Sequence, residues 1–213
     1  MFRGDTKDGP PVAGMKSGGV SLGEYMEIER RFFVNLHTEK PWRIGARCTK
    51  ITQYYLDSSL VTLDGEWLIF DGKSKIVRLE QAQLKLYSDE SDWTVRVRFR
   101  DEQTTLTLKG RRTHATAVEL EWEVERSIAE SLILENDPLF VEKQRFEWRS
   151  EDGFLWEVDE FDGGLANLIL AEVELPSEHT PVRIPPWVGV ELTGNHGWSN
   201  AALAHRASQF TRD

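Results

Sequence analysis

The stretch "WTVRVRFRDEQTTLTLKG" (Trp93–Gly110) indicates the fold of this chain most directly. Two alternating runs, Thr94–Arg100 and Thr104–Lys109, flank the three residues DEQ, and three residues are a common length for a β-hairpin loop. In the first run, two valines and a phenylalanine take one parity and three arginines take the other. Because successive side chains of a strand point to opposite faces, we expect an antiparallel hairpin with one apolar and one basic face.

Similar alternating runs occur along most of the chain. We expect further strands at Tyr25–Val34, Ile51–Asp57, AVELEWEVER (117–126), FVEKQRFEWRS (140–150), GFLWEVDEFDG (153–163) and NLILAEVELP (167–176). Apolar residues at helical spacing predict a helix in IAESLILEND (128–137), and a last helix is expected to begin near Ser199, a suitable N-cap. Short turns join most strands. The sequence therefore predicts a β-rich α+β fold, an antiparallel sheet of about eight strands that closes or nearly closes, with a few helices packed outside.

Three segments define the expected domain organisation. Residues 1–24 are rich in Gly, Pro and charge and lack the hydrophobic core of a secretory signal, so we expect a flexible leader. No linker divides residues 25–213, which are expected to form one domain. Residues 58–92 are harder to assign, although EWLIFDG and KIVRLEQAQLKLYS are consistent with a hairpin that turns at Asp71-Gly72.

Composition restricts the partners and the compartment. The 213 residues include 36 acidic and 26 basic side chains, and the net charge of −10 argues against general nucleic-acid binding. No apolar run approaches the roughly 20 residues that a membrane helix needs. The single cysteine, Cys48, excludes an internal disulfide and suits a reducing, cytoplasmic compartment.

The charged parity of the strands has two interpretations. A half-buried antiparallel strand normally has one solvated, charged face, and its cross-strand pairs contribute only about 0.2–1 kcal/mol each. Here, however, the charged positions are almost pure Arg, Lys, Asp and Glu, and the signs are segregated, with three arginines on one strand and four glutamates on another. Inside a closed barrel, such residues would bind a highly charged anion through Arg and Lys, and Mg²⁺ or Mn²⁺ through carboxylates.

An ordered set of motifs over residues 25–205 resembles one known family. The set consists of EIERRFFV, QYYL, TVRVRFR, LTLKG, ELEWEV, KQRF, WEVDEF, AEVEL and VELTGNHGWSNAALA. The first motif is similar to the Glu-x-Glu-x-Lys signature that opens the CYTH superfamily, also called triphosphate tunnel metalloenzymes. The resemblance implies a closed, antiparallel eight-stranded β tunnel that binds a triphosphate-containing small molecule together with Mg²⁺ or Mn²⁺.

The resemblance also implies roles for individual residues. Positions that match metal-holding residues of the family are Glu27, Glu29, Asp159, Glu172 and Glu174, and the mid-chain acidic strand adds Glu121 and Glu123 to the candidate metal set. Positions that match polyphosphate-binding residues are Arg96, Arg98, Lys109 and Arg145, with Lys143 in the same patch.

Two departures from the family pattern stand out. Arg31 occupies the position where the family usually has a lysine, which part of the family pairs with a tyrosine to activate water; the matching tyrosine is Tyr55. Arginine does not deprotonate in proteins, so we expect Arg31 to act as a phosphate clamp and not as a base. Residues 58–92 are longer than the usual link in short bacterial members, and we interpret them as a variable insertion, which we expect over a tunnel mouth.

The functional expectation is a divalent-metal-dependent triphosphatase that hydrolyses inorganic triphosphate or a triphosphorylated small molecule. Two alternatives stay open: a non-catalytic binder of polyphosphate or nucleotide, and a class IV-type adenylate cyclase. We expect neither nucleic acid nor membrane as a partner and leave open whether the chain forms a homodimer. The five histidines show no metal-ligand spacing, and GNHGWSN (194–200) is either a loop near a tunnel mouth or a simple helix-entry turn.

Overall fold

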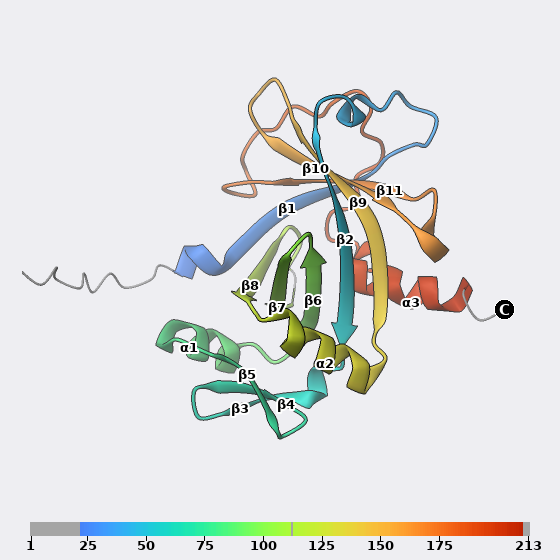
Figure 1. Cartoon of the computed structure of the whole chain (residues 1–213). Coiled ribbons are helices and arrows are strands. Elements are labelled where there is room, and N and C mark those ends of the chain that lie inside the picture. The colour runs from blue at the N-terminus through green and yellow to red at the C-terminus, as the bar shows by residue number, and fades with distance from the viewer. Residues whose placement is uncertain (1–21, 112, 211–213) are drawn as a thin grey trace, which may run out of the picture.

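The computed structural model describes residues 22–111 and 113–210 (Figure 1). The expected leader therefore lies outside the described residues except for residues 22–24, which belong to a short 3₁₀ helix, Leu22–Tyr25. Other single 3₁₀ turns are Pro41–Arg43, Ser58–Leu60, Gly163–Leu165 and His196–Trp198.

Eight antiparallel strands form the closed barrel that the sequence predicts. In spatial order they are β1 (Met26–Phe33), β11 (Ile169–Glu174), β10 (Leu155–Phe161), β9 (Leu139–Arg149), β2 (Arg47–Leu56), β6 (Thr94–Arg100), β7 (Gln103–Lys109) and β8 (Thr116–Glu123). Strand β1 closes the ring because its first three residues pair with β8 and Glu29–Phe33 pair with β11. Several strand ends differ from expectation by one to four residues; for example, β2 begins at Arg47, and the β6–β7 turn is shorter because Gln103 already pairs with Arg100.

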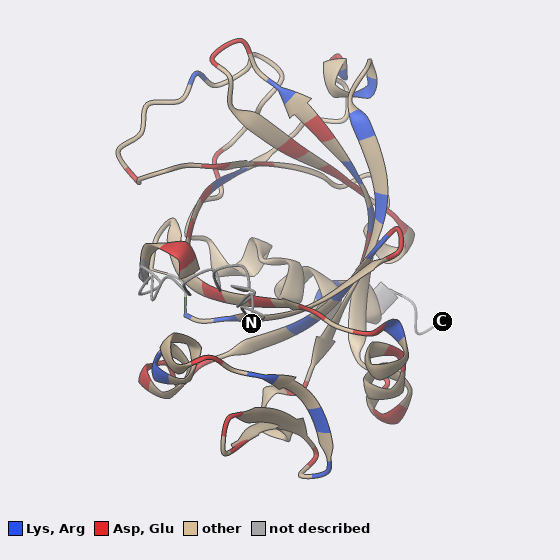
Figure 2. Ribbon diagram, turned by 60° about the vertical axis from the view of Figure 1, so that its left-hand side comes forward, with Lys and Arg blue, Asp and Glu red and all other residues tan. Residues whose placement is uncertain are grey.

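The charged faces of the strands point into the barrel. Alternate apolar residues such as Val97 and Leu106 pair across β6 and β7 with no exposed surface, and they face outward into a hydrophobic core. Charged side chains of the other parity are also buried: Glu29, Arg31, Lys143, Arg145, Asp159 and Glu172. Figure 2 shows Lys, Arg, Asp and Glu distributed around the ring of strands. The interpretation of these residues as a solvated outer face is therefore wrong for this set.

Residues 58–92 form a separate unit on the outer wall. It consists of the three-stranded sheet β3 (Val61–Asp64), β4 (Trp67–Phe70) and β5 (Ser74–Arg78), followed by α1 (Gln81–Asp89). The expected β4–β5 hairpin is confirmed, and its turn places Asp71 and Gly72 at positive φ. The later residues form a helix, because Glu80 and Gln83 make a capping box that starts α1.

The sheet of residues 58–92 does not lie over a tunnel mouth as expected, and only the end of this segment, at Asp92, reaches the lining of a cavity among the described residues. Buried residues of its sheet, among them Leu68 and Phe70, share one core with the outward side chains of β6, β7 and β8. Helix α2 (Arg126–Asn136), the helix expected at 128–137, contributes Ala129 and Leu132 to the same core. The sheet thus covers one wall of the barrel.

Helix α3 (Asn200–Phe210) closes one end of the barrel. The Ser199 hydroxyl accepts a hydrogen bond from the Ala202 amide at 3.2 Å, so the expected N-cap is confirmed. Leu203 and Ala204 pack against Val141, Phe161 and Leu170, which are buried residues of β9, β10 and β11. Val141 shares its parity with Lys143 and Arg145, so α3 contacts the inward face of the barrel. Helix α2 packs on the outside of the barrel as expected, whereas α3 packs against inward-facing side chains at one end.

Candidate functional site

A continuous chain of ion pairs crosses the wall formed by β9, β10, β11 and β1. The Lys143 ammonium donates to Asp159 at 2.5 Å, and the Arg145 guanidinium donates to both oxygens of Asp159 at 2.6 and 2.7 Å. Arg145 also contacts Glu172 at 3.1 Å. Because β-strand register sets Asp159 directly opposite Arg145, this pairing follows from the sheet itself. We refer to these residues as the first wall.

Arg31 continues the first wall into β1. Its Nε donates to Glu172 Oε1 at 2.6 Å and its Nη2 donates to Glu29 Oε1 at 3.2 Å. Its Nη1 donates to the Trp198 carbonyl at 2.7 Å. Arg31 therefore lies between two carboxylates and the segment that precedes α3, with 7% of its surface exposed.

The second wall is formed by β6, β7 and β8. Arg96 Nη2 lies 3.0 Å from Glu119 and 3.1 Å from Glu121, and Arg98 Nη2 lies 3.3 Å from Glu121. Lys109 is paired with Glu27 of β1 and lies 3.5 Å from Glu119. The buried Nε atoms of both arginines have no hydrogen-bond partner within the described residues. Two guanidinium donors of the second wall are therefore left unsatisfied by the described residues.

On the first wall, burial and neighbouring charges have opposing effects on the pKa values of the carboxyl groups. Burial raises the pKa of Glu172, but the guanidiniums of Arg31 and Arg145 outweigh it and hold that carboxyl well below its usual range. Arg145 and Lys143 likewise outweigh burial and lower the pKa of Asp159. Burial and the adjacent Arg145 lower the pKa of Lys143 to about 8, against the attraction of Asp159. Glu172 and Asp159 are therefore ionised at neutral pH.

Tyr55 is a neutral hydroxyl in this environment. Burial raises its pKa to about 12, although Arg96, Arg31 and Lys109 each favour the phenolate. Its hydroxyl donates to Gln53 Oε1 at 3.2 Å. Tyr55 can therefore donate or accept a hydrogen bond at the site, but it does not carry a negative charge near neutral pH.

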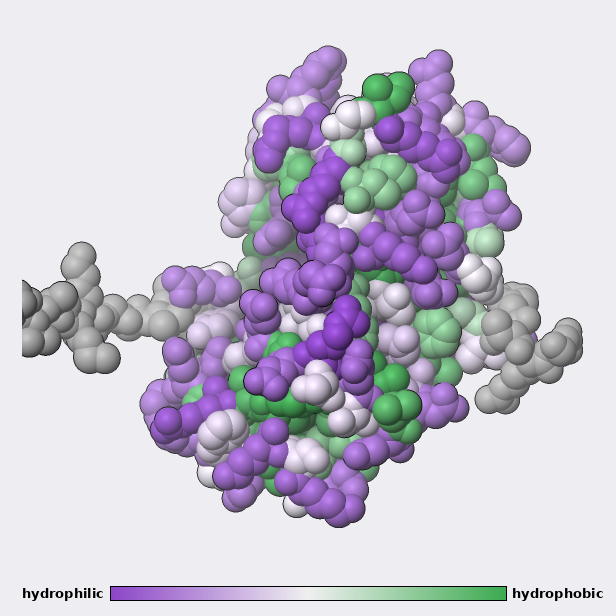
Figure 3. Space-filling view, viewed as in Figure 1, coloured by the Kyte–Doolittle hydropathy of each residue, from purple (hydrophilic) through white to green (hydrophobic). Residues whose placement is uncertain are grey.

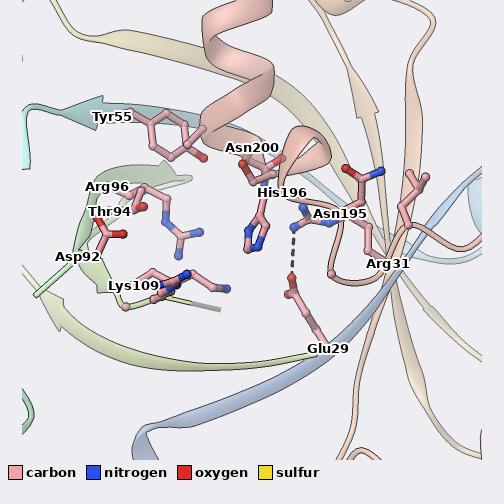
Figure 4. A pocket seen from close by; sticks show the side chains of 16 residues that line it. Glu29, Arg31, Tyr55, Asp92, Thr94, Arg96, Lys109, Asn195, His196 and Asn200 are labelled. Carbon is pink, nitrogen blue, oxygen red and sulfur yellow. Dashed lines mark hydrogen bonds and ion pairs between the residues drawn. The ribbon is translucent and has the colours of Figure 1, made fainter. Parts of the chain in front are cut away.

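A cavity of about 500 Å³ opens at the α3 end of the tunnel, and Figure 4 shows its lining. Its cationic lining residues are Arg31, Arg96, Lys109 and Arg111, and its acidic lining residues are Glu29 and Asp92. Asn195, His196 and Asn200 complete the rim from the segment that enters α3. We call this the basic cavity. GNHGWSN is therefore both a helix-entry turn and part of a tunnel mouth.

A second cavity of about 370 Å³ is lined by acids. Its carboxylates are Glu27, Glu29, Glu157, Glu172 and Glu174, and the other lining residues are Leu155, Leu175 and Pro176. Burial and the repulsion of neighbouring carboxylates raise the pKa of Glu27, Glu157 and Glu174. We call this the acidic cavity. Glu29 lines both cavities, so the tunnel has one basic and one acidic region that meet at β1.

Comparisons with known proteins agree with this architecture. The chain is 38% identical over 116 residues to an inorganic triphosphatase of Acetivibrio thermocellus, an alignment that covers 54% of the chain and 73% of the relative. It is 33% identical over 136 residues to an inorganic triphosphatase of Nitrosomonas europaea, covering 63% of the chain and 88% of the relative. The chain belongs to the CYTH, or triphosphate tunnel metalloenzyme, family. No protein-family model matches the chain.

A solved structure supports the same membership. The crystal structure of the inorganic triphosphatase NE1496 aligns with a TM-score of 0.51 and 26% identity, covering 84% of this chain and 93% of that one. Membership of the triphosphate tunnel family implies dependence on a divalent metal.

The acidic cavity suits a hard divalent cation. Such cations take oxygen ligands, and five carboxylates line this cavity. No group of three or more His, Cys, Asp or Glu side chains lies in metal-binding proximity within residues 22–111 and 113–210. Glu29 and Glu172 are engaged by Arg31 and Arg145, so their oxygens serve as counter-ions to guanidinium groups. The residues fit the ion in chemistry, and a bound ion would relieve the repulsion among them.

The candidate metal residues fall into four groups in this tunnel. Glu27, Glu29, Glu172 and Glu174 line the acidic cavity together. Asp159 is 1% exposed and paired with Lys143 and Arg145. Glu121 binds Arg96 and Arg98. Glu123, on β8 opposite Thr105, lines neither cavity among the described residues.

The candidate phosphate-binding residues lie on both walls. Arg96 and Lys109 line the basic cavity, and Arg98 follows on the same strand as Arg96. Lys143 and Arg145 lie on the first wall with Asp159. Arg31 and Tyr55 both line the basic cavity, as their pairing in the family implies. Arg31, however, has three donors committed to protein acceptors, which differs from a free phosphate clamp.

Three further residues belong to the site. Glu157 lines the acidic cavity, Glu119 pairs with Arg96 and Lys109, and His196 lines the basic cavity. Strand alternation could have identified two of them from the sequence, since Glu157 shares a strand face with Asp159 and Glu119 shares one with Glu121. The position of His196 depends on how the segment before α3 folds back onto β1, and no local pattern predicts it.

Proposed function

We propose that this chain hydrolyses inorganic triphosphate in the tunnel, with the help of a divalent cation. The observation that carries the proposal is a closed tunnel with donor-rich and carboxylate-rich regions, in a chain similar to two inorganic triphosphatases. Hydrolysis would add water to a terminal phosphorus and break one P–O–P bond, yielding orthophosphate and pyrophosphate. Such reactions require positioning and charge neutralisation more than covalent catalysis.

The second wall and the basic cavity would bind the substrate. Arg96, Arg98 and Lys109 supply cationic donors on two adjacent strands, and the buried Nε atoms of the two arginines have no partner in the described part of the chain. Guanidinium groups bind phosphate oxygens in two-point geometry, so these arginines would stabilise the charge on the transferred group. Tyr55 would orient substrate or water as a neutral hydroxyl.

The acidic cavity would hold the cation. Glu27, Glu29, Glu172 and Glu174 are the residues we assign to it, and we propose Mg²⁺ or Mn²⁺ because both prefer carboxylate oxygens. When bound, such an ion neutralises phosphate charge and polarises the bond to be broken. Lys143 and Arg145 would hold Asp159 in place beside Glu172.

We further propose a cytoplasmic location and a single tunnel domain over residues 25–213, with 58–92 as a variable insertion. The single Cys48 supports a reducing compartment, and the shared core of the insertion and the barrel supports one domain. No helix among the described residues is long and apolar enough to cross a membrane. The net charge of −10 supports a small-molecule substrate in place of nucleic acid.

A phosphate-release assay tests the proposed activity. The purified chain is incubated with inorganic triphosphate, ATP and thiamine triphosphate, each with Mg²⁺ or Mn²⁺, and we expect phosphate release from inorganic triphosphate that chelation abolishes. Glu29→Gln should remove at least about 99% of this activity, since it removes a carboxylate shared by both cavities. Glu142→Gln is the matched control, because Glu142 pairs with Lys50 on the exposed part of β9 and β2.

The other outcomes separate the alternatives. Tight triphosphate binding without phosphate release would show that the chain is a triphosphate-binding protein and not a triphosphatase. Cyclic AMP formed from ATP would instead favour an adenylate cyclase. Wild-type activity in Glu29→Gln would contradict the assignment of the site.

A further inference from the structure

Arg31 occupies a junction between three parts of the molecule. Its guanidinium reaches Glu29 on its own strand, Glu172 on β11, and the backbone carbonyl of Trp198 in the segment before α3 (Figure 4 shows the Glu29 contact). Each acceptor is reached from a different nitrogen of the guanidinium. Arg31 thus joins the carboxylates of the tunnel wall to the element that closes the tunnel.

The backbone of Arg31 is joined to the same segment. The Arg31 amide donates to Thr193 Oγ1 at 3.0 Å, and the Leu192 amide donates to the Arg31 carbonyl at 2.7 Å. The segment 191–200 therefore docks on β1 at this residue through both backbone and side chain. We call residues 191–200 the closing segment, because they lead into α3 and place Asn195, His196 and Asn200 on the rim of the basic cavity.

A lysine would not reproduce this junction. An ammonium presents its donors from a single nitrogen atom, whereas a guanidinium distributes five N–H groups over three nitrogens in one plane. The acceptors of Arg31 lie around this plane at 2.6, 2.7 and 3.2 Å. The replacement of the usual family lysine therefore changes what position 31 does in this chain.

We propose that Arg31 is a positioning residue that couples the Glu29–Glu172 carboxylate pair to the closing segment. A change at either carboxylate alters the position of the Arg31 guanidinium. Because that guanidinium also holds the Trp198 carbonyl, the shift alters the position of the closing segment at the rim of the basic cavity. Any ligand that engages the oxygens of Glu29 and Glu172 then acts on the closing segment as well. The inference deepens the proposed triphosphatase function, and its main test does not depend on that function.

Amide hydrogen exchange of the substrate-free protein tests the coupling. In Arg31→Lys we expect residues 193–204 to exchange at least about tenfold faster than in the wild type, the effect of losing one hydrogen bond from a charged donor. Arg78→Lys is the matched control, because Arg78 lies on β5 of the outer sheet and binds Glu66 there through two nitrogens, away from the closing segment. The control should leave residues 200–204 at the wild-type rate.

Glu172→Gln provides the second arm and does not alter position 31. Glu172 lies on β11 and reaches the closing segment through Arg31. We expect faster exchange over residues 193–204 in this variant, and no further increase when Arg31→Lys is added to it. Additive effects of the two changes would overturn the coupling, because independent sites add.

Enzyme kinetics distinguish positioning from acid–base chemistry. If Arg31 positions the site, Arg31→Lys lowers kcat for triphosphate hydrolysis and leaves both limbs of its pH–rate profile where they are in the wild type. A displaced alkaline limb would show that the lysine titrates in the reaction and would overturn the positioning role. Unchanged hydrogen exchange in Arg31→Lys would overturn the proposal even if triphosphatase activity is present, and loss of the triphosphatase function would leave the exchange result intact.

Discussion

The pKa of Lys143 shows how strongly its surroundings in the barrel affect a single side chain. None of its surface is exposed, its ammonium lies 2.5 Å from Asp159, and it sits 5.5 Å from the centre of the Phe161 ring. Burial and the neighbouring Arg145 oppose its charge more than Asp159 favours it, so its pKa falls to about 8. Lys143 is thus a cation held in the barrel at a cost in stability.

This cost predicts a pH dependence of folding. Between the folded pKa of about 8 and the ordinary lysine value of 10.5, Lys143 is neutral when folded and protonated when unfolded, so unfolding takes up a proton. Stability should therefore rise with pH across this window. Denaturant unfolding of wild type and Lys143→Met from pH 7.5 to 9.5 measures the effect as a difference in slope. Equal dependence of the unfolding free energy on pH in the two proteins would contradict the lowered pKa of Lys143. The comparison is matched because Arg145 still pairs with Asp159 in the variant.

At the scale of elements, the outer sheet and α3 pack on opposite faces of the barrel strands. The sheet β3–β4–β5 packs on the outward faces of β6, β7 and β8, while α3 packs on inward side chains at the end of the tunnel. The sheet therefore supports the second wall from behind. Hydrophilic side chains cover most of the face shown in Figure 3, with apolar areas between them.

Replacing Leu68 tests the supporting role of the sheet. Leu68 has no exposed surface, and Leu68→Ala should cost about 2–5 kcal/mol of unfolding free energy because it leaves a cavity between sheet and barrel. The KM for triphosphate should stay near the wild-type value, since Leu68 lies behind the wall. Leu134→Ala, at a residue 85% exposed on α2, should change stability by no more than about 0.5 kcal/mol. A large rise in KM in a folded Leu68→Ala protein would show that the sheet shapes the site directly.

At the scale of the whole molecule, the tunnel is electrically divided. The basic cavity has four cationic side chains in its lining, and the acidic cavity has five carboxylates and no cationic lining residue within the described chain. Separation of this kind would let an anion and a metal cation occupy adjoining regions that share only Glu29 among their charged lining residues. It also leaves the carboxylates of the acidic cavity repelling one another when no cation is bound.

This repulsion predicts how stability responds to cations and pH. The pKa values of Glu27, Glu157 and Glu174 are raised, so the folded protein keeps protons that the unfolded chain releases, and the cation-free protein gains stability as pH falls from 7 through these values. Added Mg²⁺ or Mn²⁺ should raise Tm most at pH 7, and the increase should shrink towards pH 5 as protons replace the ion.

Thermal melts with and without Mn²⁺ at pH 7, 6 and 5 measure this response. Glu174→Gln should reduce the increase at pH 7, whereas Glu142→Gln on the outer face should not. An increase in Tm that is independent of pH would place the ion away from these carboxylates.

Much of the fold was predictable because its signals are local. Alternating parity identified the strands of the barrel, the Asp71-Gly72 pair identified a turn, and Ser199 identified the start of α3. The placement of Glu27, Glu29 and Arg96 on the charged faces of their strands was also predictable, since they stand in short strand patterns. Each of these depends on residues a few positions apart, where backbone geometry alone sets which side chains share a face.

Only the tertiary structure decided which charges pair and what closes the tunnel. Asp159 faces Lys143 and Arg145 because of β9–β10 register, and it lies outside the acidic cavity lining. Arg31 meets Trp198 across 167 residues of sequence, and α3 turns inward because apolar side chains line that end of the barrel. Such contacts follow from strand register and long-range packing. The sequence by itself therefore determined which charged side chains share a strand face, and closure of the barrel decided how they are joined.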